Sequence, residues 1–153
     1  MIHLYDNPEK SELDILAYHE AAHAVMSYLL GYSLGKIEIN SDEISGACWS
    51  DCRNNVRPVI PELQGIAQRE KRIIINCAGY ASESLLIGAE PDWCWSSDYH
   101  ASLKELTPAY GQKIAQVYIE LVTIWAKEIS SKYWAVIEAL ADALVWYSER
   151  NRF

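Results

Sequence analysis

The chain has 153 residues, half of them hydrophobic, and it carries a formal net charge of −8. This length fits one domain over residues 1–153, and the apolar content excludes an intrinsically disordered chain. The negative charge disfavours phosphate backbones and anionic membrane surfaces, so we expect neither nucleic acid nor a membrane as partner. We find neither a signal peptide nor the roughly 18 continuous apolar residues of a spanning helix. The sequence therefore predicts a soluble, cytoplasmic domain.

The first predicted element is a helix over residues 12–30. Ser11 suits the N-cap position, and Asp14 three residues later forms an imperfect capping box. Gly31 suits the left-handed position that commonly follows a helix. The stretch LDILAYHEAAHAVMSYLL is apolar apart from a group of three ionisable side chains in its middle.

A small hairpin is predicted after this helix. Residues 35–40 alternate between apolar and polar side chains, which is typical of a half-buried strand. Residues 45–51 could return beside it across a turn near Asp42 and Glu43. The polar residues 52–58 are expected to form a loop.

Four further helices are expected in the rest of the chain, over residues 61–87, 97–106, 109–129 and 133–150. Pro61 is tolerated in a first turn, and Gly88 suits a helix end. A turn-rich loop over 89–95 leads to a cap at Ser96 or Ser97, and we expect the next helix to end before Pro108. The predicted fold class is therefore mainly α, with about five helices and one small β-hairpin.

The four cysteines do not form a recognisable zinc ribbon. Cys48 and Cys52 are separated by three residues and form the one loose pair, whereas a ribbon needs two close pairs. We expect all four, with Cys77 and Cys94, to be reduced thiols that are buried or partly buried.

One motif in the first helix carries chemistry. His19, Glu20 and His23 match the pattern H-E-x-x-H. Histidines four residues apart lie on one helix face with Cβ atoms about 6 Å apart, so both rings can reach one zinc ion at about 2.0–2.1 Å. Glu20 lies about 100° further round the helix. There it can act as general base on a water in an open coordination position.

The alternative is a pair of core histidines satisfied by hydrogen bonds, since the same face carries core residues such as Met26. A core gains nothing from two imidazoles and a carboxylate that each need a partner, so we favour metal binding. A catalytic zinc takes three protein ligands and keeps one open position. Spacing alone leaves the third ligand open among Glu83, Asp98 and His100, with His3 less suited because it lies near the terminus.

Three segments in series resemble the peptidase domain of the FtsH-type (AAA) zinc metalloproteases. AYHEAAHAV (17–25) is similar to the family's A-Y-H-E-A-G-H-A, CAGYASESL (77–85) to its G-G-R-A-A-E-E-L, and SSDY (96–99) to its S-N-D-L. The resemblance covers residues 12–130 loosely and implies a zincin-like, FtsH-peptidase-like fold around the H-E-x-x-H helix.

The resemblance also implies roles for single residues. His19 and His23 would be zinc ligands, and Asp98 the third. Glu20 would be the general base. Glu83 matches a carboxylate of the following helix and would orient a ligand imidazole.

Together these features predict a zinc metalloendopeptidase. No G-x-x-x-x-G-K-[ST] phosphate loop occurs in the chain, so we expect ATP-independent cleavage of peptides or of unfolded and flexible protein segments. The resemblance suggests that residues 35–40 border the cleft and receive an extended substrate at their edge. His100 could stabilise an oxyanion. The alternatives are a non-cleaving peptide-binding or regulatory module that retains the zinc site, and a helical protein with a structural zinc.

Aromatic side chains are frequent in the last two predicted helices. We expect them to be core residues at helical spacing, and their density also permits an apolar homo-oligomer interface. They are Tyr118, Trp125, Trp134, Trp146 and Tyr147.

Overall fold

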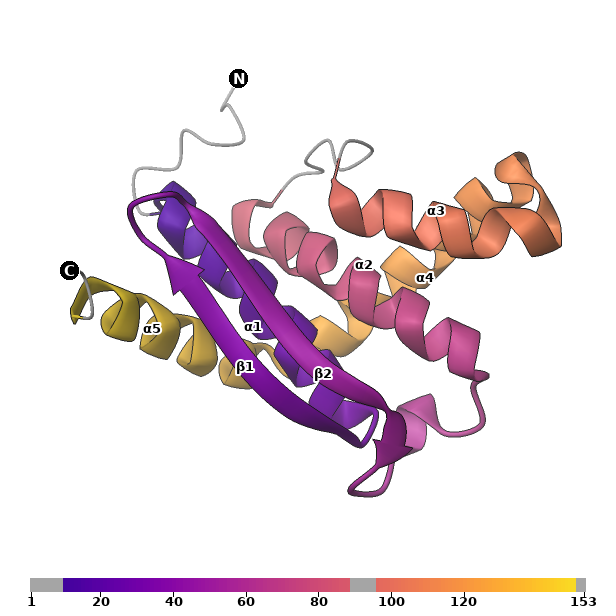
Figure 1. Cartoon of the computed structure of the whole chain (residues 1–153), viewed down its shortest axis with the longest axis horizontal. Coiled ribbons are helices and arrows are strands. Elements are labelled where there is room, and N and C mark those ends of the chain that lie inside the picture. The colour runs from indigo at the N-terminus through magenta and orange to yellow at the C-terminus, as the bar shows by residue number, and fades with distance from the viewer. Residues whose placement is uncertain (1–9, 89–95, 151–153) are drawn as a thin grey trace.

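The helix that carries His19 and His23 lies at the centre of the fold. A computed structural model describes residues 10–88 and 96–150. In it the helix α1 (Glu12–Leu29) contacts the second helix, the last helix and both strands. Figure 1 shows the hairpin lying along α1, with the remaining helices grouped on its other sides. Because α1 is covered from several directions, 12 of its 18 residues are buried.

Both ends of α1 follow the sequence expectation. The Ser11 hydroxyl accepts a hydrogen bond from the Asp14 amide at 3.1 Å, and the Asp14 carboxylate accepts one from the Ser11 amide at 3.0 Å. These two bonds complete the predicted capping box. Gly31 has φ +83°, the left-handed conformation expected of it.

The hairpin is longer than predicted. Strand β1 (Tyr32–Asn40) pairs antiparallel with β2 (Ser45–Asn55), and the Asn40 side chain accepts the amides of Asp42 and Glu43 in the turn. The expectation of a loop from residue 52 was wrong, because β2 continues to Asn55. The Asn55 side chain donates to the Leu30 carbonyl at 2.7 Å, so polar residues hold this end of the strand to α1.

The second helix begins later than predicted. Pro61–Leu63 forms one 3-10 turn that ends at Gln64, whose backbone is extended, and Gly65 follows with φ +81°. Helix α2 then runs over Gln68–Ile87 and ends at Gly88, whose φ of +71° fits the predicted left-handed cap.

The third helix passes through its proline. Helix α3 (Ser97–Tyr110) begins at the predicted cap, Ser96, whose hydroxyl accepts the Tyr99 amide at 3.1 Å. The expected end before Pro108 was wrong. Pro108 removes one amide from the last turn, and α3 still continues to Tyr110, where the Gly111 amide donates to the Thr107 carbonyl at 2.8 Å. Gly111 then separates α3 from α4 (Gln112–Lys132), and α5 (Trp134–Arg150) follows.

The core is continuous around α2. One side of α2 packs on α1 and the other on α4, and its Ile73, Ile74 and Cys77 are fully buried. Cys77 is a free thiol, as are the partly buried Cys48 and Cys52, which agrees with the prediction for the cysteines that the structure describes. Cys94, His3 and the predicted loop 89–95 lie outside the described residues.

The aromatic residues divide into two groups. Tyr118, Trp125 and Trp134 are partly buried against the core, as predicted. Trp146 and Tyr147 are 49% and 60% exposed, so for these two the expectation of a core position was wrong. Among the helices of residues 10–88 and 96–150, none is both long enough and apolar enough to cross a membrane.

Candidate metal centre

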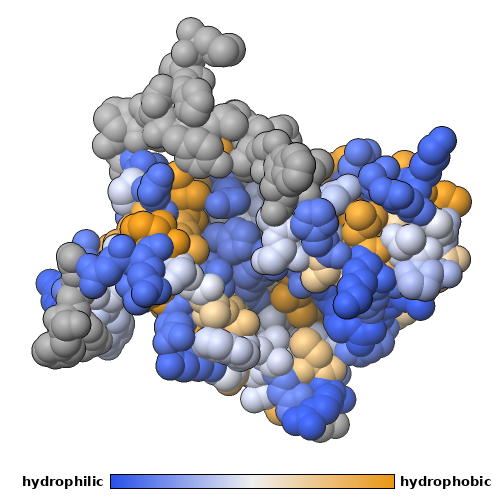
Figure 2. Space-filling view, turned by 45° about the horizontal axis from the view of Figure 1, so that its top comes forward, coloured by the Kyte–Doolittle hydropathy of each residue, from blue (hydrophilic) through white to orange (hydrophobic). Residues whose placement is uncertain are grey.

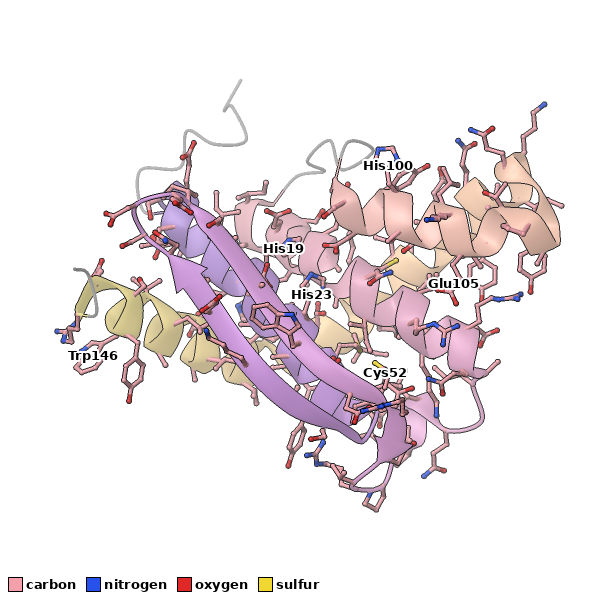
Figure 3. The ribbon with its side chains drawn as sticks, viewed as in Figure 1. His19, His23, Cys52, His100, Glu105 and Trp146 are labelled. Carbon is pink, nitrogen blue, oxygen red and sulfur yellow. The ribbon has the colours of Figure 1, made fainter. Side chains whose placement is uncertain are left out.

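Three potential ligand atoms from two helices meet beside α1. The Nε2 atoms of His19 and His23 are 3.0 Å apart, and Oδ2 of Asp98 lies 2.9 Å from the first and 3.1 Å from the second. His19 and His23 lie one turn apart on α1, whereas Asp98 comes from the first turn of α3. In Figure 3 the two histidines are seen between the hairpin and α2. Asp98 is 79 positions from His19 and 75 from His23 in the sequence, yet the three side chains meet here.

The far nitrogen of each ring is directed at an oxygen. His23 Nδ1 lies 2.7 Å from the Ile75 carbonyl, which can only accept, so Nδ1 carries a proton and the ring directs Nε2 toward Asp98. His19 Nδ1 lies 3.6 Å from the Glu83 carboxylate. Such contacts orient the rings of metal-binding histidines and favour the Nε2 ligand. Glu83 therefore lies behind the His19 ring and not among the three meeting atoms.

Gly79 makes room for the His19 ring. A Cβ at this position of α2 would stand 2.5 Å from Nε2 and Cε1 of His19 and 2.7 Å from Nδ1. Contacts that short cannot be accommodated without moving the ring. Glycine in a helix interior costs about 0.5–1 kcal/mol relative to alanine. We attribute its presence to the close approach of α2 to His19.

Glu20 lies under the hairpin. Its exposed fraction is 6%, and burial raises the pKa of its carboxyl while the charges of His23 and His19 oppose that change. A Cβ on Gly46 of β2 would stand 2.9 Å from Glu20 Cγ, so a second glycine permits close packing at this point. Ligand atoms of His19, Glu20 and His23 lie within 4.8 Å of one another, so this group could hold a metal ion.

Charge and hydrogen bonding couple Asp98 to the histidines. Burial lowers the pKa of His19, but Asp98 and Glu83 outweigh it and raise that pKa to about 10. Burial raises the pKa of Asp98, but hydrogen bonds from His19 and His23 hold it well below its usual range. A cation bound at this point would balance the charge of the carboxylates in place of protonated imidazoles.

The meeting atoms fit a tetrahedral zinc ion. At bond lengths of about 2.0–2.1 Å, two ligands of a tetrahedral zinc lie about 3.3 Å apart. The three distances of 2.9, 3.0 and 3.1 Å between the Nε2 atoms of His19 and His23 and Oδ2 of Asp98 are slightly shorter. Both carboxylates lie near the histidines, and we prefer Asp98 to Glu20 as third ligand because its Oδ2 contacts both Nε2 atoms.

The other sequence candidate does not join this group. His100 is exposed, its ring makes an edge contact with Tyr99, and Figure 3 shows it on the side of α3 turned away from His19 and His23. Two residues along a helix correspond to about 200° of rotation, so His100 and Asp98 point in nearly opposite directions. The structure gives His100 no place near the three ligand atoms.

Strand β2 lies directly against Glu20. The residues that approach Glu20 are Gly46 and Cys48 of β2, and burial together with the Glu20 charge raises the pKa of Cys48 to about 11. Strand β2 is also tied to α2, since the Gln68 side chain donates to the Cys52 carbonyl at 2.9 Å. The Glu38 carbonyl and the Ile39 side chain of β1 lie beside the same Gly46, so the expectation that residues 35–40 border the site stays a prediction.

A groove of about 810 Å³ lies between the hairpin and the end of α5. Its lining includes the acidic Glu38, Asp42 and Glu43 and the aromatic Trp49 and Tyr147. Gly46 lines it as well, and is the one lining residue that the contacts above place against Glu20. Figure 2 shows the surface after a 45° turn from Figure 1. Hydrophilic residues (blue) lie at the centre of this face, with hydrophobic residues (orange) on either side.

Comparisons with protein-family models, with curated proteins and with solved structures found no match to this chain.

Proposed function

We propose that the chain is a zinc metallopeptidase that hydrolyses peptide bonds in peptides or in unfolded and flexible protein segments. One observation carries the proposal. His19 Nε2, His23 Nε2 and Asp98 Oδ2 meet within 3.1 Å of one another, and a ligand oxygen of Glu20 lies within 4.8 Å of ligand atoms of both histidines. The motif resemblance to FtsH-type peptidase domains supports it, since residues of all three segments gather at this point.

The residues would divide the work as follows. His19, His23 and Asp98 would hold the ion, and Glu83 and the Ile75 carbonyl would keep the two rings in place. Zinc in such a site supplies a Lewis acid for a peptide carbonyl and makes water acidic enough to be activated near neutral pH. Glu20 would accept the proton of the attacking water and pass it to the leaving amine. Its raised pKa suits a group that both takes and gives a proton.

An extended substrate would lie along β2. The sheet has two strands in the part of the chain that the structure describes, so β2 pairs with β1 at one edge only. Main-chain hydrogen bonds to a free strand edge bind extended peptides with little dependence on their sequence. Gly46 and Cys48 place this strand next to Glu20.

The test is cleavage of an unstructured protein by the purified chain loaded with zinc, without added nucleotide. We expect cleavage that a chelator stops and zinc restores. Glu20→Gln should keep one zinc per chain and lose turnover, whereas Glu120→Gln, a matched change at an exposed position of α4, should leave both unchanged. Cleavage by the Glu20→Gln variant at the wild-type rate would refute the proposed role.

A peptide-binding module that retains the metal site but does not cleave is the second candidate. The 6% exposure of Glu20 favours it, because a general base must reach a water molecule. In the same assay this candidate predicts binding of the unstructured protein with no cleavage, by both the wild-type chain and Glu20→Gln.

A further inference from the structure

Helix α4 carries a row of exposed aliphatic side chains on its outer face. Ile114, Val117, Leu121 and Ile124 are 59%, 54%, 63% and 63% exposed. Their spacings of three, four and three residues are those of the a and d positions of a heptad repeat. The four side chains therefore form one continuous stripe, which we call the α4 stripe.

The α4 stripe is not needed for the core. The opposite face of α4 already supplies the buried Ala115, Ile119, Val122 and Ala126, and α4 packs with it against α2 and α3. A surface helix of a monomer normally has one apolar face and one polar face. Contiguous exposed apolar patches of several hundred Å² commonly mark interaction sites. The second apolar face of α4 therefore indicates a surface that binds a partner.

We propose that the α4 stripes of two copies of this chain pair antiparallel about a two-fold axis. Ile114 and Ile124 lie equally far from position 119 along the helix, and so do Val117 and Leu121. An axis opposite residue 119 therefore sets Ile114 against Ile124 of the other copy and Val117 against Leu121. Each apolar layer meets an apolar layer, and the antiparallel direction also opposes the two helix dipoles favourably. An interface of this symmetry closes on itself as a dimer.

The area available meets the requirement of a specific interface. Each stripe residue still shows more than half of its surface, on the order of 100 Å² for a side chain of this size. Eight such side chains from two copies give roughly 800 Å², and the half-buried Tyr118 and Trp125 beside the stripe would raise the total to about 1,000 Å², the lower bound for a specific interface. The dimer is therefore expected to be weak and dependent on concentration.

Pairing through the stripe would leave the candidate metal centre uncovered. The buried face of α4 contacts α2, and α1 packs on α2 from another side; in Figure 1 α4 lies behind α2, on the far side from the hairpin. The proposal does not depend on the proposed peptidase activity. Because each copy carries a net charge of −8, added salt should strengthen the dimer by screening repulsion between the copies.

The chain offers a matched pair of variants for the test. Val117 in the stripe and Val136 on α5 are both 54% exposed. By analytical ultracentrifugation we expect a wild-type dimer, a dissociation constant raised at least about tenfold by Val117→Glu, because the variant buries an unpaired charge, and little change for Val136→Glu. Circular dichroism should show equal helix content in all three. A wild-type chain that stays monomeric, or equal effects of the two variants, would overturn the proposal.

A second experiment tests the antiparallel direction. Leu121→Lys alone should also weaken the dimer. In the double variant Val117→Glu/Leu121→Lys each introduced acid faces an introduced base of the other copy, so association should recover relative to either single variant. A parallel pairing would set acid against acid and base against base, and no recovery would then be seen. Absence of recovery therefore contradicts the two-fold antiparallel arrangement.

Discussion

Gly79 of α2 lies against the imidazole of His19, so close that a Cβ there would stand 2.5 Å from two ring atoms. In an ordinary helix interior Gly→Ala stabilises by about 0.5–1 kcal/mol. Here we predict that Gly79→Ala lowers zinc affinity by about 10- to 100-fold, because the ring must move off the meeting point. Competition with a chromogenic chelator measures the affinity. Unchanged affinity with higher stability would show that the ring does not depend on this glycine.

Asp98 as zinc ligand and Glu83 as the partner of a ligand ring should differ in their effect on zinc affinity. We predict that Asp98→Asn abolishes tight zinc binding, whereas Glu83→Gln weakens it by about 10-fold, the effect of losing a partner behind a ligand ring. Calorimetric titration of the metal-free chain with zinc compares the two directly. A larger loss for Glu83→Gln would exchange their roles and would make Glu83 the third ligand.

The two capped helices provide a further comparison. Ser11 caps α1 and Ser96 caps α3, each by accepting an amide at 3.1 Å. Replacing either by alanine should cost about 1 kcal/mol of folding stability, measured by chemical denaturation of the metal-free chain. Only Ser96→Ala should also weaken zinc binding, because Asp98 lies in the first turn of the helix that Ser96 begins. Equal effects of the two variants on zinc affinity would contradict the role of Asp98 as a zinc ligand.

Zinc should stabilise the fold. A ligand present at 100 times its dissociation constant adds about 2.7 kcal/mol, which for a domain of this size corresponds to a rise of several degrees in Tm. We expect that rise for the wild-type chain and none for His23→Ala, as followed by differential scanning calorimetry. The metal-free chain should remain folded, since its apolar core is continuous around α2. Unfolding on removal of the metal would instead indicate a structural zinc.

Much of the fold follows from local signals in the sequence. The capping box at Ser11 and the glycines at 31 and 88 mark helix ends through contacts within a few residues, and the structure has them as expected. The errors lie where tertiary contacts decide. Strand β2 reaches Asn55 because that side chain binds the end of α1.

The candidate centre shows the same division. The pattern of His19, Glu20 and His23 is local, and it indicated a metal site without help from the rest of the chain. Gly79 and the Ile75 carbonyl could not be identified, since their roles depend on how closely α2 approaches α1. The helical repeat could have excluded His100, because two residues along a helix turn a side chain away from Asp98.

The most direct test of the central claim is a crystal structure of the zinc-loaded chain with anomalous data collected at the zinc edge. We predict one peak per chain, at about 2.0–2.1 Å from Nε2 of His19 and of His23 and from a carboxylate oxygen of Asp98. Absence of a peak at this position, or a zinc ion bound by cysteine instead, would contradict the assignment.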